Sequence, residues 1–124
     1  MHVLRNMIEA VRPSGVVLDL QVIRPNPRVE CGASLVCEID GEPLFRQADA
    51  ATAAVDDLIR HGVLAEEAVD EHDVLKHYSD GGDLVDDFEG KDRRLPVEAL
   101  PRLRALTEPC VVRERCLLRR LVKL

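Results

Sequence analysis

The start of the chain carries the apolar pattern of a helix followed by a strand. Apolar side chains recur at helical spacing as far as Val11, and Pro13-Ser14-Gly15 ends this pattern. Residues 16–23 form a run rich in β-branched side chains with little polar alternation, which is typical of a strand covered on both faces. We therefore expect a buried interior strand here. Arg24-Pro25-Asn26-Pro27 is expected to end it, because proline lacks a backbone donor and restricts the residue before it.

The next part of the chain predicts a hairpin and then a long helix. Asp40-Gly41 favours the positive φ angles of a two-residue turn and stands between two short apolar runs. Because proline cannot donate to a strand ladder, Pro43 makes the second run an edge strand. We therefore expect a hairpin over residues 34–46, inserted outside the main sheet. Residues 48–61 follow with the clearest helical stripe of the chain.

The second half of the chain predicts a strand, short helices and a closing strand. Residues 63–78 favour a strand with a turn around Glu71, and residues 79–88 favour a short helix whose acidic start suits the helix dipole. Residues 95–106 predict one helix or two half-helices, because a proline interrupts them. The last segment, residues 110–124, predicts a long terminal strand, with or without a bulge.

Together these elements predict a single domain with a mixed sheet flanked by helices. Its parts are residues 1–23 (helix and buried strand), residues 34–46 (hairpin insertion) and residues 48–124 (helix, strand, helices and terminal strand). The size of 124 residues and the 46% share of hydrophobic residues suit one globular domain. Aromatic residues make up only 2%, so the core must be aliphatic and there is little on which bases could stack.

The charges exclude some classes of partner. Lys and Arg number 17 and Asp and Glu 23, which gives a net charge of −6. An acidic chain is a poor binder of nucleic acid and anionic membranes, so neither is expected as a partner. Residues 65–92 hold eleven acidic residues, whereas residues 111–124 hold five basic ones. This segregation indicates either a basic strand edge lying near an acidic helix layer or an acidic rim that selects cationic partners.

The four cysteines are Cys31, Cys37, Cys110 and Cys116. Their number suggests disulfides or a metal, but neither pair has the short spacing of a zinc knuckle, and the first residues lack a signal-peptide core. We therefore expect buried reduced thiols that pack as small hydrophobic groups, and a soluble cytoplasmic protein.

Titratable side chains are densest just before Ser79. On a strand, alternate residues share a face, so His72 and His77 point to opposite sides. Three roles stay open for this segment. Asp73 and His77 could join a third ligand to hold a metal, His77 could act as a general base beside Tyr78, or the side chains are only solvated. We assign no metal site, and the chain has no glycine-rich phosphate loop and no Gly-x-Ser-x-Gly elbow.

Taken in order, the segments resemble the C-terminal half of class I S-adenosylmethionine-dependent methyltransferases. Residues 3–19 carry the resemblance, because they are similar to that family's helix, Arg-Pro-Gly-Gly-like turn and fifth strand, with Ser14 in place of the first glycine. The resemblance implies an α/β fold with a mixed, mostly parallel sheet, flanking helices and an antiparallel C-terminal strand. It would be a truncated Rossmann-like methyltransferase fold with an inserted β-hairpin.

The same resemblance implies a function. The family's Gly-x-Gly loop would precede Met1, so the chain would be the substrate-side portion of a methyltransferase-like transferase, inactive alone. S-adenosylmethionine would be the family's cofactor, with His2 near it, while His77 and Tyr78 would lie on the side of the methyl acceptor. No catalytic residue is assigned.

The alternative is a small non-enzymatic α/β domain that self-associates or binds a partner through an exposed sheet edge. Both hypotheses predict association, as a homodimer through the strand of residues 16–23 or a neighbouring edge, or with a complementing chain. Whether the chain is an enzyme stays open.

Overall fold

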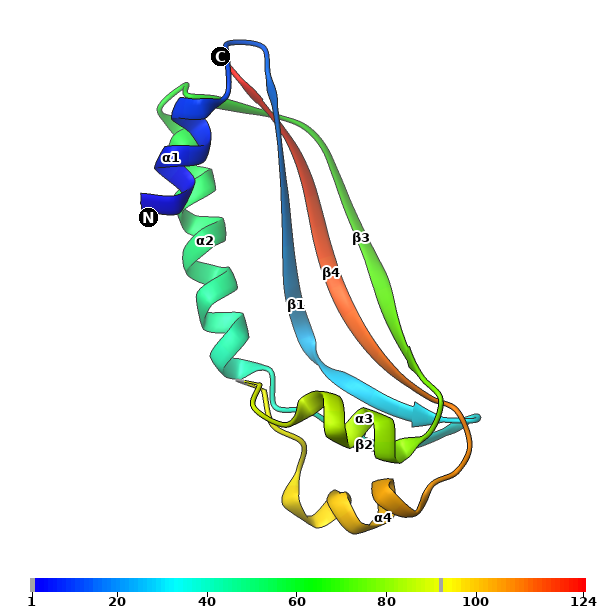
Figure 1. The fold of residues 1–124 in the computed structure, drawn as a ribbon. Helices are drawn as coiled ribbons and strands as arrows, with labels where there is room; N and C mark the ends of the chain where they lie inside the picture. The colour runs from blue at the N-terminus through cyan, green and yellow to red at the C-terminus, as the bar shows by residue number, and fades with distance from the viewer. Residues whose placement is uncertain (1, 92) are drawn as a thin grey trace.

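A computed structural model describes residues 2–91 and 93–124, and for residues 2 and 3 it describes the backbone alone. In chain order the elements are α1 (His2–Ala10), β1 (Val16–Cys31), β2 (Ser34–Glu38), α2 (Glu42–Arg60), β3 (Leu64–Tyr78), α3 (Gly81–Phe88), the 3-10 helix η1 (Val97–Ala99), α4 (Leu100–Ala105) and β4 (Cys110–Lys123). Figure 1 shows the long strands β1, β4 and β3 side by side, with α1 and α2 along one end of the sheet and α3 and α4 at the other.

The sheet has four strands in the order β2-β1-β4-β3, and every neighbouring pair is antiparallel. The expected mostly parallel sheet is therefore wrong, and with it the Rossmann-like fold and the resemblance to methyltransferases. Because β4 is antiparallel to both neighbours, β1 and β3 run in the same direction. Two strands joined by a crossover helix, here α2, have this relative direction. The closing strand β4 lies between them, so no parallel pair forms.

Strand β1 is longer than expected because the proline segment does not end it. The register between β1 and β4 shifts between Ile23 and Arg28, so the prolines stand in an irregular stretch where the ladder needs no donor from them. Beyond this stretch β1 pairs again with β4, and it also pairs with β2 over Arg28–Cys31. The strand thus spans the length of the molecule.

The hairpin expected over residues 34–46 is also wrong. Its first run is β2, which folds back on the end of β1, and its second run is the start of α2. Pro43 stands in the first turn of α2, where a helix loses no hydrogen bond to a missing N–H. Asp40 accepts the backbone N–H of Glu42 through its side chain, so Asp40-Gly41 leads into a helix and does not turn between strands.

Strand β3 runs from Leu64 to Tyr78 without the expected turn at Glu71. Its register against β4 shifts between Glu66 and Ala68, which is a bulge. The short helix over residues 79–88 is confirmed as α3, and the half-helices over residues 95–106 are confirmed as η1 and α4. The long terminal strand is confirmed too, although it lies inside the sheet and not at its edge.

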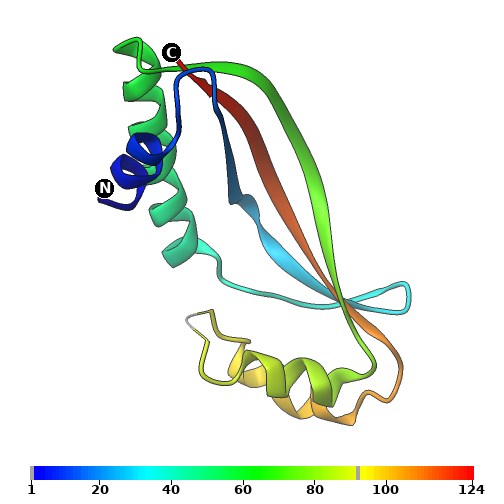
Figure 2. The same cartoon turned by 45° about the horizontal axis from the view of Figure 1, so that its top comes forward.

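Two hydrophobic cores lie on opposite faces of the sheet. At one end of β4, Cys110 and Val112 are buried against α3 and α4; at the other end, Leu121 is buried with Val17 of β1 and Val55 of α2. Since successive side chains of a strand alternate between faces, even-numbered and odd-numbered residues of β4 face opposite sides. Figure 2 shows the two helix layers at opposite ends of the curved sheet. Each sheet face is therefore covered by a helix pair at one end only.

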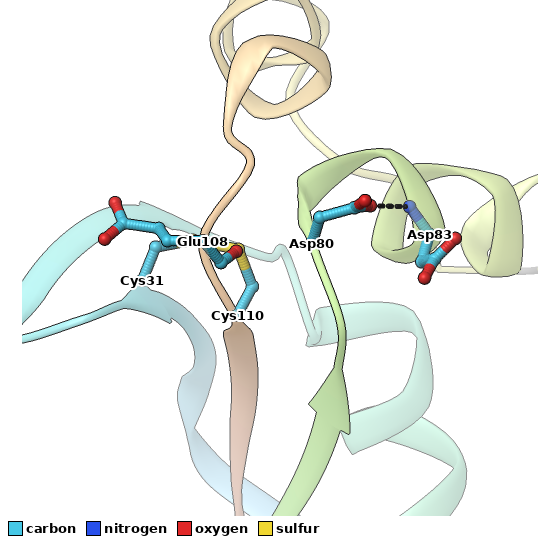
Figure 3. Close-up of a disulfide and its surroundings, with 5 residues drawn as sticks. All are labelled: Cys31, Asp80, Asp83, Glu108 and Cys110. Atoms are coloured by element: carbon cyan, nitrogen blue, oxygen red, sulfur yellow. Dashed lines mark hydrogen bonds between the residues drawn. A yellow bond between two sulfur atoms is a disulfide. The ribbon is translucent and has the colours of Figure 1, made fainter.

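Cys31 and Cys110 form a disulfide between neighbouring strands (Figure 3). The two residues are paired in the register of β1 and β4, with their Cα atoms 4.3 Å apart. The expectation of reduced thiols is wrong for this pair, because a separation of 79 residues in sequence gave no hint of the shared register. Cys37 and Cys116 are free, the first half-buried and the second buried.

Candidate functional site

Of the residues expected on the substrate side, Tyr78 joins a polar cluster at the end of β3. Its hydroxyl donates to Asp87 Oδ2 over 2.6 Å, and the same oxygen accepts from Lys76 at 2.9 Å and Lys91 at 3.0 Å. These three donors hold the pKa of Asp87 well below its ordinary value. Burial raises the pKa of Tyr78, and its bond to Asp87 raises it further. The arrangement stabilises a carboxylate and ties α3 to β3.

His77 does not join this cluster. It pairs with Val111 in the ladder, whereas Tyr78 pairs with Cys110, so the two side chains point to opposite faces. His72 instead contacts Asp70, with 2.8 Å between Nδ1 and Oδ2. Within the part of the chain that the structure describes, no three metal-ligating side chains come together. The side chain of His2 lies outside the described residues.

Sequence reasoning missed Asp87 as the partner of Tyr78. A signal for the helix that carries Asp87 exists in the chain, because Asp80 caps α3 by accepting the backbone N–H of Asp83 (Figure 3). That cap begins a helix immediately after β3, and tertiary packing brings this helix back beside the strand. The acid on the facing side of the helix then reaches Tyr78.

The segregated charges meet across the β3–β4 ladder. Arg115 contacts Asp73 and Glu71, and each of these acids stands on β3 beside the basic strand. Arg119 is only 6% exposed and donates to Glu66 on β3 and Asp56 on α2. Burial alone would lower the pKa of Arg119, but these two hydrogen bonds outweigh burial and raise it. The basic strand is therefore central, and its main acidic partner is a strand and not a helix layer.

Residues 16–23 of β1 form what we call the open edge. On one side they pair with β4 over the whole segment. On the other side no strand described at residues 2–91 or 93–124 pairs with them, because β2 pairs with Arg28–Cys31 only. Leu18 is 60% exposed and Leu20 is 55% exposed, whereas Val17, which points to the opposite face, is buried. The expected interior strand covered on both faces is wrong: this segment is an edge strand covered on one face.

The other sheet edge, β3, has a different character. It carries five acidic residues along its length, Glu66, Glu67, Asp70, Glu71 and Asp73. Charged side chains on an edge strand discourage pairing with a second strand. The open edge, by contrast, holds a single ionisable residue, Asp19, which has the same parity as the buried Val17. Its exposed face presents only aliphatic side chains.

A cavity of about 250 Å³ lies between the open edge and the helices α1 and α2, and we call it the edge cavity. Its lining residues are Leu4, Met7, Val17, Leu18, Asp19, Gln21, Ala51, Val55 and Leu121. Gln21 Nε2 donates to Asp19 Oδ1 over 2.7 Å. The second carboxylate oxygen, Oδ2, is buried and accepts no hydrogen bond from any residue that the structure describes. The cavity lining is thus mostly aliphatic, and the unpaired Asp19 oxygen has almost no solvent-accessible surface.

Comparisons of the chain with protein-family models, with curated proteins and with solved structures find no match. Nothing in these comparisons supports a methyltransferase or S-adenosylmethionine, and the antiparallel sheet is incompatible with the fold on which that interpretation relied. Of the helices in the described ranges, none is long and apolar enough to cross a membrane. The function must therefore be argued from the open edge and its surroundings.

Proposed function

We propose that the chain is an assembly domain that forms a homodimer by pairing the open edges of two copies. The observation that carries this proposal is the exposure of aliphatic side chains on a strand whose outer side is unpaired over residues 16–23. An unpaired strand edge offers a row of backbone donors and acceptors, and an apolar edge without protective charges is a template for another strand.

A two-fold axis perpendicular to the sheet would pair the edges in antiparallel fashion. Closed two-fold dimers use the same patch on both copies, so each backbone group of one edge meets its counterpart in the other. The sheet would continue from β4 and β1 of one copy into β1 and β4 of the second. Leu18 and Leu20 of both copies would then lie on one face, where cross-strand aliphatic pairs stabilise the sheet.

Charge favours β1 over β3 as the paired edge. Two copies of β3 would bring acidic side chains opposite one another, and like charges directly opposite on a sheet are destabilising. At the open edge, Asp19 lies on the helix-covered face, away from Leu18 and Leu20. The length of the edge is limited by the irregular stretch after Ile23, where the register with β4 shifts.

Sedimentation equilibrium of the full chain at micromolar concentration tests the proposal. We expect a mass of about 27.6 kDa, twice the 13.8 kDa of one chain. Leu18→Lys should give the single-chain mass, because it places a cation on each copy at the contact and removes apolar burial. Val69→Lys is the matched control, since Val69 is 56% exposed on the edge strand β3. It should leave the dimer unchanged.

Two results would contradict the proposal. The first is a single-chain mass for the unmodified protein throughout the micromolar range. The second is a dimer that withstands Leu18→Lys but dissociates in Val69→Lys, which would assign the interface to β3. Far-ultraviolet circular dichroism of each variant separates loss of assembly from loss of folding.

The cytoplasmic location stays a prediction, and the state of the thiols tests it. Disulfides persist mainly in oxidising compartments, so the Cys31–Cys110 bond removes the reduced-thiol argument for the cytoplasm. Acid quenching of cells followed by alkylation and mass spectrometry reports the state of both cysteines. Alkylated Cys31 and Cys110 would fit a cytoplasmic protein, and an unalkylated pair would contradict that location.

A further inference from the structure

The backbone of β1 determines which residues of the open edge can bond to a second copy. The N–H of Lys123 donates to the carbonyl of Gly15 over 2.9 Å, one position beyond the first pair in the register of β1 and β4. Hydrogen-bonded and non-hydrogen-bonded pairs alternate along an antiparallel ladder, and this register has no shift from Val16 to Ile23. The odd-numbered residues of the open edge therefore direct their backbone groups to β4. The even-numbered residues direct theirs outward, and these are Val16, Leu18, Leu20 and Val22.

A two-fold axis perpendicular to the sheet limits how two open edges can align. Both copies then present the same sheet face to the same side, so residues that meet across the contact have the same parity. The axis must therefore pass through one residue that meets its own counterpart. An axis at Asp19 pairs residues 16–22, and an axis at Leu20 pairs residues 17–23. Axes at Leu18 or Gln21 pair only residues 16–20 or 19–23, so Asp19 and Leu20 give the two longest contacts.

The charge of Asp19 decides between these two alignments. With the axis at Asp19, its carboxylate faces the same carboxylate of the second copy in a non-hydrogen-bonded pair, where opposite side chains lie closest. Like charges directly opposite on a sheet are destabilising. Arg119 lies opposite Asp19 on β4, but its hydrogen bonds go to Glu66 and Asp56, so it does not form an ion pair with Asp19. The axis at Leu20 avoids this repulsion.

We propose that Asp19 sets the alignment of the dimer, with the two-fold axis at Leu20. Leu20 then meets its own counterpart, and Leu18 meets Val22 of the partner subunit. On the helix-covered face, Asp19 meets the partner's Gln21, so an uncharged amide lies opposite each carboxylate. Aliphatic side chains thus meet on the exposed face and polar ones on the other. This inference rests on the proposed dimer and names the residue that determines its specificity.

Disulfide cross-linking of cysteine variants of the full chain tests the alignment. Cα atoms of a hydrogen-bonded antiparallel pair are about 5.5 Å apart, and a disulfide requires a Cα separation below about 7 Å. Leu20→Cys should therefore link two chains under mild oxidation. Leu18→Cys is the matched control on the same exposed face, and it should link at least about tenfold more slowly, because the partner's Val22 lies opposite it. Mass spectrometry of the linked peptides separates these bonds from any that involve Cys37.

Asp19→Asn in the Leu20→Cys chain tests the role of the charge. An axis at residue 19 would add one hydrogen-bonded pair, Val16 with Val22 of the partner subunit, and the carboxylate repulsion opposes it. Without that repulsion, linking through residue 20 should slow by about threefold or more, since its counterpart becomes a diagonal neighbour about 7–8 Å away. Asp49→Asn removes an exposed acid of α2 and should leave the rate unchanged.

Three results would overturn the alignment. One is faster linking of Leu18→Cys than of Leu20→Cys. Another is linking between residues 18 and 20 in Leu18→Cys/Leu20→Cys, with Asp19 unchanged. The third is linking of Leu20→Cys at the same rate with and without Asp19→Asn. Sedimentation of the unmodified chain separates these failures from failure of the dimer: a dimeric mass leaves only the alignment overturned, whereas a single-chain mass overturns both proposals.

Discussion

Asp87 shows how one side chain can connect two elements. It lies on α3 and accepts hydrogen bonds from Tyr78 and Lys76 on β3 and from Lys91 after the helix. Because these donors favour the ionised carboxylate, the pKa of Asp87 in the folded chain lies well below its ordinary value of 3.8. A carboxylate of this kind links the stability of the fold to pH.

The sign of that pH dependence follows from the direction of the shift. A carboxyl group whose pKa is depressed by folding stabilises the folded state fully above its unfolded pKa, and this stabilisation is lost as the pH falls towards the folded pKa. We therefore expect the unmodified chain to unfold at a higher urea concentration than Asp87→Asn at neutral pH. The difference between the two midpoints should shrink below about pH 4. Asp86→Asn, on the neighbouring exposed position, controls for changes to α3. A difference that stays constant down to pH 2 would contradict the argument.

Strand β1 illustrates how far sequence patterns predict the elements of this chain. The run of Val and Ile residues predicted a strand correctly, and helical spacing predicted the body of α2. The pattern could not tell which faces of β1 are covered, because an apolar edge strand and an interior strand share the same composition. Pro43 predicted an edge strand but stands in a first helical turn, where proline is equally acceptable. The local sequence around Pro43 is compatible with both an edge strand and a helix start, and tertiary contacts select the helix.

The candidate site was predicted only in part for the same reason. Residues 16–23 were named as an association strand because the truncated fold that the resemblance implied would expose them as an edge, whereas the edge cavity depends on how α1 and α2 pack on that strand. Tyr78 was named, but its partner Asp87 depends on the angle at which α3 returns to β3. The pairing of Cys31 with Cys110 depends on the register of β1 against β4. Register and packing angle are long-range properties that no local pattern in this chain encodes.

The alternation of faces along β1 can be tested with two adjacent substitutions. Val17 is 4% exposed and packs with Leu121 and Val55, so Val17→Lys places an unpaired ammonium group in a core. We expect it to lower the free energy of unfolding by several kcal/mol, on the order of 3 kcal/mol or more. The side chain of residue 18 points to the exposed face, so Leu18→Lys should change the free energy of unfolding of a single chain by less than about 1 kcal/mol. Urea unfolding at a concentration below the dimer dissociation constant measures both. Equal losses would contradict the assigned faces.

At the scale of the whole molecule, the long strands connect two separate cores. The helix pair α1 and α2 covers one face at one end, and α3 with α4 covers the opposite face at the other end. Between them the sheet is held by its own ladder and by ion pairs from β4 to β3. Pairing of two open edges would place β1 inside a wider sheet, so dimerisation would satisfy the backbone donors and acceptors that no strand pairs with in the single chain.

The Cys31–Cys110 disulfide fixes the end of the sheet that carries α3 and α4. It joins residues 79 positions apart, so it strongly restricts the unfolded chain. Removing both sulfur atoms in Cys31→Ala/Cys110→Ala should lower the free energy of unfolding by about 2 to 5 kcal/mol. Cys37→Ala removes a half-buried free thiol at the same end and serves as the control.

The loss of stability in Cys31→Ala/Cys110→Ala should also be confined to one end of the sheet, because the two cores share only the strands that connect them. Hydrogen exchange of the amides around Val112, in the core beside the disulfide, should accelerate more than exchange around Leu121 in the other core. Equal acceleration at both positions would mean that the sheet unfolds as a single cooperative unit. Chemical reduction of the native chain should reproduce the pattern of the double variant, since it breaks the same bond without altering the side-chain volumes of the core.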